Sequence, residues 1–232
     1  MIFGGIQKNS LIDYPGKLSC VLFTIGCNFV CPYCHNAGLV RADAPFPQRL
    51  SEDAVFDFLA GRTRFLEGVV ITGGEPTLHP ELEKICRRIR ALGYPVKLDT
   101  NGSRPKVLER LIQGNRLDCI AMDVKTDPAA YAPHIWPAAQ PSDILKSIAL
   151  IKASGLPHEF RTTCVKTIVT SQAVDRIADI IQGADGYALQ QFQPENVLKP
   201  EFFSGRDLRY SAEELQQLKA VVGDRVKTCV IR

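Results

Sequence analysis

The sequence predicts an α/β fold built on parallel strands, and three observations lead to this prediction. From residue 17 onward, short apolar runs rich in β-branched residues alternate with helix-like stretches, which is the pattern of strand–helix–strand units. Six such units follow one another, as in an eight-unit barrel that lacks its last two units and stays open on one side. The 232 residues show no break in composition, so we expect a single domain over 1–232. An open doubly wound sheet is the alternative, because both folds need buried parallel strands.

The predicted strands are the apolar runs, and the predicted helices are the stretches between them. The strands lie near residues 19–24, 69–72, 96–99, 119–124, 160–165 and 187–192. The helices lie near 52–61, 81–92, 106–112, 143–154, 173–181 and 212–222. Ser51 precedes an acidic first turn, Pro80 and Pro105 stand at first-turn positions, and Ser211 with Glu214 forms a capping-box pattern.

Three stretches fit no predicted element. They are the N-terminal extension 1–16, the segment 127–141 with its four prolines, and the segment 195–210. Function concentrates in loops on a rigid scaffold, yet a proline-rich loop is often plain connection. Partner contact and simple connection therefore both stay open for these segments.

The charge pattern argues against two classes of partner. The 28 basic and 25 acidic residues are spread along the chain, the net charge is +3, and no run of five like charges occurs. We therefore expect binding neither to nucleic acid nor to a membrane surface. No apolar stretch is long enough to span a membrane, and the N-terminus lacks the order of a signal peptide, so we expect a cytoplasmic protein.

The eight cysteines fall into two groups. Five stand singly, at 20, 86, 119, 164 and 229, mostly inside apolar runs, where buried small side chains are the better interpretation. Cys27, Cys31 and Cys34 lie together in the segment CNFVCPYC, with no fourth cysteine nearby. Soft thiolates favour iron–sulfur clusters, zinc or copper(I), and three ligands leave one position open for a substrate. A zinc knuckle with His35 as its fourth ligand is the structural alternative.

The CxxxCxxC spacing, with an aromatic residue just before the last cysteine, resembles the signature of the radical S-adenosylmethionine (SAM) enzymes. The resemblance implies a partial (β/α)6 TIM-like barrel of parallel strands, open on one side. It also implies a [4Fe–4S] cluster held by Cys27, Cys31 and Cys34, with S-adenosyl-L-methionine bound at the open iron. In that family an electron from the cluster cleaves SAM to methionine and a 5′-deoxyadenosyl radical. Tyr33 would shield the cluster with its ring and contact adenine through its backbone.

A glycine motif extends the resemblance. Gly73, Gly74 and Glu75 directly follow the predicted strand at 69–72, at the carboxyl end where barrel active sites are built. Taken alone, the motif is a turn whose glycines let the backbone come close to a ligand. It resembles the GGE motif of the family, which binds the SAM amino group.

Polar segments also end the next two strands, DTNG at 99–102 and DVK at 123–125. Separately they are typical of an Asx-capped turn and of an ordinary ion pair, with Asp123 and Lys125 on one face of their strand. Together they resemble segments of glycyl-radical-enzyme activases. The resemblance implies that Asp99, Thr100 and Asp123 bind a monovalent cation and that Lys125 neutralises the SAM carboxylate.

The last two predicted strands add further candidates. Arg161 needs an acceptor, because an unpaired guanidinium is costly to bury, and SAM, Glu159 and Asp123 are all candidates. Residues 190, 191 and 193 are glutamines, of which the last two share a face; which face looks inward is open. We take Gln191 as the candidate SAM contact.

Residues 10–16 and 20–36 look most like the activating proteins of anaerobic ribonucleoside-triphosphate reductase. Between Cys34 and Gly73 there are no further cysteines, so we expect one cluster and no ferredoxin-like insert. The resemblance implies an enzyme that abstracts hydrogen from a glycine of that reductase, with flavodoxin or ferredoxin as electron donor. The alternatives are an activase of another glycyl-radical enzyme, such as a formate lyase, a small-molecule radical SAM enzyme, and a non-catalytic iron–sulfur or zinc module.

Overall fold

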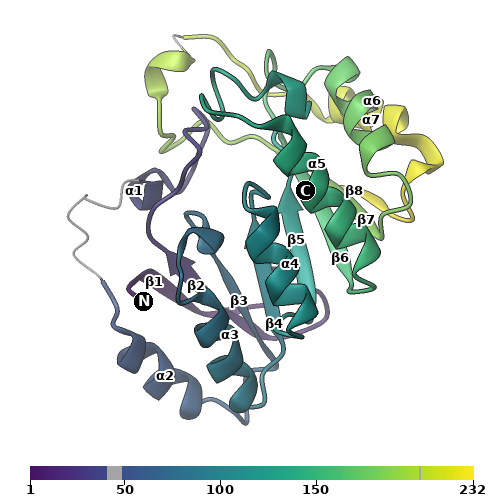
Figure 1. Ribbon diagram of the computed structural model, residues 1–232. Helices are drawn as coiled ribbons and strands as arrows, with labels where there is room; N and C mark the ends of the chain where they lie inside the picture. Colours follow the sequence, from purple (N-terminus) through teal and green to yellow (C-terminus); the bar gives the residue numbers. More distant parts are fainter. Residues whose placement is uncertain (41–48, 204) are drawn as a thin grey trace. The chain divides into compact units, whose positions relative to one another are not determined.

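The computed structural model describes residues 1–40, 49–203 and 205–232 (Figure 1). The described chain forms two compact units, each assembled from separate parts of the sequence. The first consists of Met1–Asn28, Gly38–Thr100 and Lys106–Ile120, and the second of Phe29–Ala37, Asn101–Pro105 and Ala121–Arg232. The prediction of a single domain stays a prediction, because two compact units can belong to one domain.

After two consecutive strands at the start, strands and helices alternate along the described chain, with two helices between the second and third strands. The strands are β1 (Phe3–Ser10), β2 (Ser19–Thr24), β3 (Gly68–Gly73), β4 (Val96–Thr100), β5 (Cys119–Asp123), β6 (His158–Cys164), β7 (Gly186–Gln191) and β8 (Cys229–Ile231). The α-helices are α1 (Ala37–Val40), α2 (Glu52–Ala60), α3 (Leu82–Ala91), α4 (Pro105–Gln113), α5 (Pro141–Ala153), α6 (Ser171–Ile180) and α7 (Ala212–Val222). The order of the strands in the sheet follows the sequence from β1 to β8. Each strand from β2 to β7 is followed by a helix before the next strand, so the predicted succession of six strand–helix units is confirmed.

In the first unit, β2, β3 and β4 pair in parallel. Their register places Val21 opposite Val70 and Val70 opposite Lys97, so these three side chains lie on one face. Val21 and Val70 belong to a buried apolar cluster on that face. Every residue of β4 is buried, including the charged Lys97 and Asp99.

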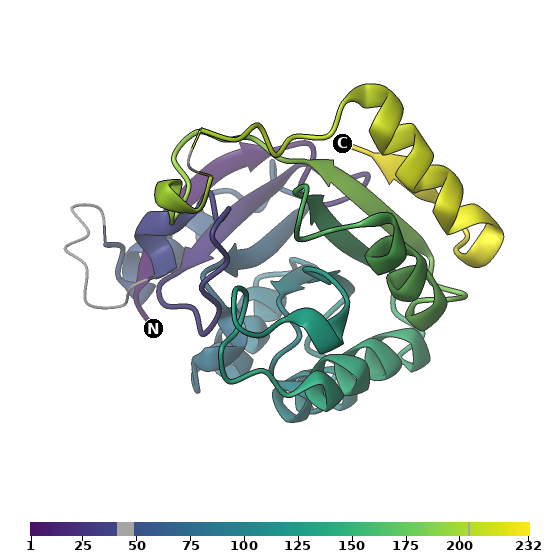
Figure 2. The same cartoon turned by 90° about the horizontal axis from the view of Figure 1, so that it is seen from above.

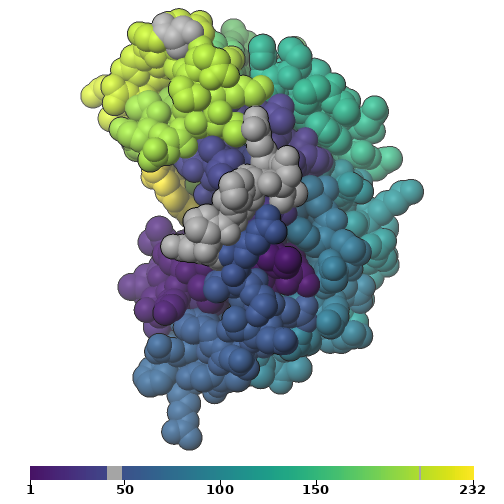
Figure 3. All heavy atoms as spheres, turned by 90° about the vertical axis from the view of Figure 1, so that its left-hand side faces the viewer, coloured from purple at the N-terminus to yellow at the C-terminus, as the bar shows by residue number. Residues whose placement is uncertain are grey.

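The expectation that residues 1–16 hold no regular element is wrong. Phe3–Ser10 forms β1, which pairs antiparallel with β2 and has irregular register near both ends. Only the end residues Phe3 and Ser10 are buried, and β1 lies at the surface of the first unit (Figure 3, dark purple). An edge strand with little buried surface needs no apolar alternation, so its sequence shows no strand period.

In the second unit, β6, β7 and β8 pair in parallel. Helices α6 and α7 pack side by side (Figure 1), and α7 lies along β8 (Figure 2, yellow). β8 is not predictable from the sequence, because three residues are too few to show a period.

The helix boundaries reflect the start signals. Ser51 caps α2 through a hydrogen bond from the Ala54 amide, and Ser211 and Glu214 form the predicted capping box of α7. Pro105 is the first residue of α4, whereas Pro80 lies just before α3 rather than in its first turn.

The other two unassigned segments contain short 3₁₀ turns. Pro128–Ala130 forms one within 127–141, and Pro200–Phe202 forms one within 195–210, of which Ser204 lies outside the described residues. Within the described ranges, no helix combines the length and the apolar character needed to cross a membrane.

Candidate cofactor site

The glycine motif ends β3 in close contact with the chain's own backbone. The Gly74 amide donates to the Thr24 carbonyl at 2.9 Å, and the Glu75 amide donates to the Gly26 carbonyl at 2.8 Å. A Cβ added to Gly74 would lie 2.0 Å from the Gly26 oxygen, and one added to Gly73, which has a φ of +113°, would lie 2.3 Å from the Thr24 nitrogen. The two glycines are therefore required because the motif packs directly against 24–26, the residues that precede Cys27.

The side chain of Glu75 is fully buried and holds its neighbours in place. Its Oε1 accepts hydrogen bonds from the Thr77 amide at 3.0 Å, from the Thr77 hydroxyl, and from the Thr100 hydroxyl at 2.7 Å. The first of these caps the 3₁₀ turn Pro76–Leu78. In the structure this carboxylate therefore ties the glycine motif to the end of β4.

Asp99 lies in β4 beside a charged residue that the sequence analysis did not single out. Lys97 stands two positions earlier on the same face of the strand, and its Nζ forms an ion pair with Asp99 Oδ1. The side chains of Lys97 and Asp99 are only 3% and 7% exposed. A lysine inside an apolar strand is the signal that could have identified this pair from the sequence.

Two predicted cluster ligands, Cys31 and Cys34, belong to the second unit, with Tyr33 between them. The Cys34 amide donates to the Cys31 carbonyl at 3.1 Å, which closes a tight turn. Burial raises the pKa of the Cys34 thiol, and the positive charge of Lys125 opposes this effect. The charge of Lys125 thus favours the thiolate form of Cys34, which is the form that a predicted cluster ligand needs.

Aromatic residues of the segment 127–141 hold the start of this cysteine loop. Phe29 packs edge-on against Tyr131, with ring centroids 5.7 Å apart, and its ring lies tilted by 31° against Trp136, with centroids 5.2 Å apart. The Val30 amide donates to the Ile135 carbonyl at 2.8 Å. The segment 127–141 is therefore part of the support of the cysteine loop.

The end of the cysteine loop is held by the segment that follows β7. The Lys199 amide donates to the Pro32 carbonyl at 3.0 Å, and Nε2 of His35 lies 2.6 Å from the Gln193 carbonyl oxygen. The His35 ring also stacks near Phe192. These contacts give the segment 195–210 and residue 193 a structural role beside the cysteines.

Two predicted SAM contacts in the second unit carry buried polar atoms without a hydrogen-bond partner in the described structure. They are the Tyr33 hydroxyl and Oε1 of Gln191. Nε2 of Gln191 donates to the Tyr210 carbonyl at 3.0 Å, which fixes the orientation of the amide. Buried polar atoms are almost always satisfied, so these two suit a bound polar molecule.

Asp123 forms the centre of a charged cluster in the second unit. Its Oδ1 accepts from Nε of Arg161 and its Oδ2 from Nζ of Lys125, both at 2.9 Å. Burial alone would raise the pKa of Asp123, but these two cations outweigh it and hold the pKa well below its usual range. Asp123 is thus the structural acceptor of Arg161, while the other candidate, Glu159, pairs with Arg232.

Replacing Asp123 by Asn will destabilise the protein in a pH-dependent way. At pH 7 we expect a loss of about 2–3 kcal/mol in the free energy of unfolding, because Lys125 and Arg161 lose their counter-charge. Because the pKa of Asp123 is lower in the folded than in the unfolded protein, its ionised carboxylate contributes fully to stability above the unfolded-state pKa of about 3.9. This contribution decreases as the pH falls from that value toward the lower folded-state pKa. Urea unfolding between pH 7 and pH 3 will show the difference from the wild type narrowing below about pH 4.

The matched control is Glu159→Gln, which removes a more exposed pair. The side chain of Arg232 is 47% exposed, so we expect this variant to change the stability by less than about 1 kcal/mol. A difference between Asp123→Asn and the wild type that stays constant down to pH 3 would contradict the charge-based account.

Asn101 forms the predicted Asx turn, since its Oδ1 accepts from the Ser103 amide at 3.0 Å. The Ser147 hydroxyl donates to the Gly102 carbonyl at 2.7 Å. These bonds give the second half of the DTNG segment a turn-forming role in the second unit.

The three cysteines belong to different units, Cys27 to the first and Cys31 and Cys34 to the second. None of the three forms a disulfide. Within the described residues, no three His, Cys, Asp or Glu side chains are arranged to hold a single metal ion. A four-iron cluster does not require such an arrangement, because each of its cysteines binds a different iron. The ligand assignment stays a prediction.

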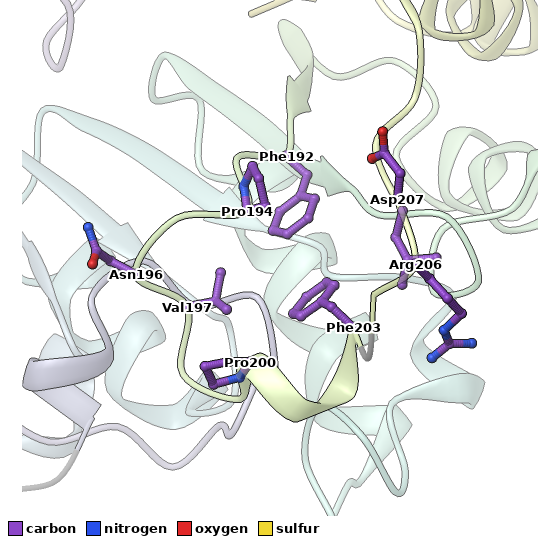
Figure 4. Close-up of a pocket in the computed structure, with 9 residues that line it drawn as sticks. Phe192, Pro194, Asn196, Val197, Pro200, Phe203, Arg206 and Asp207 are labelled. Atoms are coloured by element: carbon purple, nitrogen blue, oxygen red, sulfur yellow. The ribbon is translucent and has the colours of Figure 1, made fainter.

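A pocket of about 470 Å³ lies in the second unit, lined by the segment that follows β7 (Figure 4). Its lining comes from the segment 192–208 and is mostly apolar, with Phe192 and Phe203 stacked at 5.0 Å. Arg206 and Asp207 are the charged residues of the lining. No motif of the sequence analysis pointed to this pocket.

Comparison with known proteins gives one match to a protein-family model. The model described as the radical SAM superfamily matches residues 21–180. A solved structure, Streptococcus suis SuiB bound to S-adenosylmethionine, resembles the chain with a TM-score of 0.68 at 15% identity, covering 90% of this chain and 49% of SuiB. The family match and this likeness confirm the predicted partial (β/α)6 barrel class.

Three curated proteins of similar sequence carry names of different activities. A protein of Methanocaldococcus jannaschii with the provisional name of glycyl-radical enzyme activating enzyme is 35% identical over 100% of this chain and 95% of its own length. A Halobacterium salinarum protein, provisionally named a GTP 3′,8-cyclase, is 31% identical over 78% of this chain and 52% of its own length. The pyruvate formate-lyase-activating enzyme of Staphylococcus epidermidis is 32% identical over 41% of this chain and 39% of its own length.

Proposed function

Because the chain belongs to the radical SAM superfamily, we propose that it is a glycyl-radical activase whose partner is an anaerobic ribonucleoside-triphosphate reductase. The observation that carries the proposal is the relative named as a glycyl-radical activating enzyme, which is similar over the whole chain and nearly its own whole length. The choice of the reductase rests on the segments 10–16 and 20–36 of the sequence.

The residues present fit the cofactors of this superfamily. Three thiols outside disulfides suit a [4Fe–4S] cluster with one open iron, and the unsatisfied polar atoms of Tyr33 and Gln191 suit a bound polar molecule such as SAM. With both bound, the cluster would pass one electron from a flavodoxin or ferredoxin to SAM, and the reductive cleavage of SAM would supply the hydrogen abstraction from the partner's glycine.

The protein's own side chains bind, orient and exclude water in this proposal. Cys27, Cys31 and Cys34 hold the cluster, and the buried Tyr33 ring keeps water from it. The close packing of Gly73 and Gly74 on 24–26 fixes the amino-binding motif next to Cys27.

The charged cluster of Asp123, Lys125 and Arg161 would orient the carboxylate of SAM. Lys125 would bind the SAM carboxylate, and Asp123 holds both Lys125 and Arg161 in position. Because the cofactors carry the difficult chemistry, no side chain needs to act as acid or base.

A small-molecule radical SAM enzyme is the second candidate, and the similarity to the archaeal GTP 3′,8-cyclase favours it. This chain covers only about half of that relative, whereas it covers nearly all of the activating-enzyme relative. An activase of the formate lyase type is a third candidate, with similarity over a shorter stretch.

The test is 5′-deoxyadenosine production by the anaerobically reconstituted protein with dithionite and SAM. We expect production to rise when an anaerobic ribonucleotide reductase is added, together with a glycyl-radical signal on that reductase by electron paramagnetic resonance. Stimulation by a formate lyase instead would transfer the proposal to that partner. Production without any partner effect would favour the small-molecule reaction, and no production on an intact cluster would favour a non-catalytic iron–sulfur module.

A further inference from the structure

The Lys97–Asp99 ion pair in β4 needs an explanation, because lysine is among the residues least often buried. Lys97 lies opposite Val70, on the face that carries the apolar cluster of the first unit. The pair is more deeply buried than a second lysine–carboxylate pair of that unit, Lys84–Glu52, whose lysine is 55% exposed. Burying two charges is costly, so a purely stabilising role is a weak account of the pair.

The predicted ligands of a monovalent cation are all engaged inside the protein. Asp99 pairs with Lys97, and the Thr100 hydroxyl donates to Glu75. Alternation along β4 also sends the side chains of Asp99 and Thr100 to opposite faces. In the second unit, both oxygens of Asp123 accept from cationic side chains. These residues do not fit a bound sodium or potassium ion.

A lysine ammonium group can neutralise a carboxylate as a sodium or potassium ion does. Both carry one positive charge, and the lysine group has three donors for the oxygens around it. A second cation brought against Asp99 would be repelled by the Lys97 charge, and the repulsion is strong because the site is shielded from water.

We propose that Lys97 takes the place of the monovalent cation that the family resemblance implies at Asp99, so that this protein folds and binds SAM without sodium or potassium. The SAM part rests on the proposed function, whereas the folding part concerns the protein without cofactors. A covalently attached charge would make the site independent of the salt around the protein.

The first experiment uses the wild-type protein in sodium, potassium or choline chloride at equal ionic strength. Thermal unfolding of the cofactor-free protein and equilibrium SAM binding to the reconstituted protein are both measured. We expect the same unfolding midpoint in the three salts and SAM dissociation constants that agree within about twofold. A midpoint that is lower in choline, or SAM binding that is weakened at least about fivefold in choline, would overturn the proposal.

The second experiment asks whether removing the lysine creates a cation site. We expect Lys97→Met to unfold at a lower temperature than the wild type in choline and to recover part of the loss in sodium or potassium. The Lys84→Met control, which removes the exposed ammonium that pairs with Glu52, should show no such preference. A folded Lys97→Met protein with the same midpoint in all three salts would overturn the proposal.

These outcomes separate the inference from the proposed function. If the reconstituted protein fails to bind SAM in any salt, the proposed function fails, while the unfolding of the cofactor-free protein still tests Lys97. If Lys97→Met does not fold in any salt, the wild-type salt comparison decides.

Discussion

Replacing any one of Cys27, Cys31 or Cys34 by Ala will abolish SAM cleavage. Each thiolate is assigned to a different iron of the cluster, so two remaining ligands cannot hold it in the form that leaves a single iron open. Because uncatalysed cleavage supplies no background, we expect 5′-deoxyadenosine production to fall by at least about a thousandfold, a loss of roughly 4 kcal/mol or more of catalysis. Iron and sulfide content and the absorption of the reconstituted protein are measured in parallel, to show that the loss begins at the cluster.

Cys86→Ala is the matched control, because Cys86 is a fully buried thiol in α3 of the first unit. Burial raises the pKa of Cys86 to about 12, so this thiol stays protonated and is a poor metal ligand. We expect Cys86→Ala to lose some stability to the small cavity and to keep its iron and its cleavage activity. A cluster that survives in Cys31→Ala but is lost in Cys86→Ala would show that the ligand assignment is wrong.

The succession of strands and helices from β2 to α7 could be predicted from local sequence patterns. Apolar runs and capping residues repeat along the chain, and each depends on neighbours within a few positions, as Ser51 and Ser211 illustrate. β1 could not be predicted from its own sequence, because it has no apolar face. It forms a strand because it pairs with β2. Only contacts between separate parts of the chain could have indicated it.

The residues of the candidate site could be predicted from the sequence, but most of the contacts between them could not. The DVK motif predicts Asp123 and Lys125, and the position of Arg161 on a strand predicts that it needs an acceptor, of which Asp123 is one of three candidates. Nothing in the sequence connected Phe29 with Tyr131 and Trp136, since the two segments lie about a hundred residues apart and meet only through packing. The proline-rich segment 127–141 thus has a role at the cysteine loop that its composition does not reveal.

Glu75 shows a different limit of motif reasoning. The motif indicated a SAM contact, whereas the structure gives its carboxylate three internal donors and complete burial. A glutamate at this position can be required because it contacts SAM or because it holds the site together, and the sequence pattern is the same for both roles. The contribution of the glycine motif to SAM binding is therefore best tested at the glycines.

Gly74→Ala will weaken both the fold and SAM binding. The added Cβ would lie 2.0 Å from the Gly26 carbonyl oxygen, so the backbone at 73–75 or at 24–26 must move. The obstacle is backbone rather than a flexible side chain, so we expect a loss near the upper end of the overpacking range, about 3 kcal/mol. Because Gly26 precedes Cys27, we also expect the SAM dissociation constant of the reconstituted protein to rise at least about tenfold, which corresponds to 1.4 kcal/mol.

Gly5→Ala is the matched control within the first unit. No atom lies within 4 Å of the position where its Cβ would stand, so we expect a change of less than about 0.5 kcal/mol in the free energy of unfolding and unchanged SAM binding. Urea unfolding and equilibrium SAM binding on both variants separate two roles of Gly74. A Gly74→Ala protein that is destabilised but binds SAM normally would limit this glycine to packing the loops together, and the proposed amino-binding role of the motif would then have no support from this residue. A rise in the dissociation constant under conditions where the variant is fully folded would instead place the SAM amino group at the contact between 73–75 and 24–26.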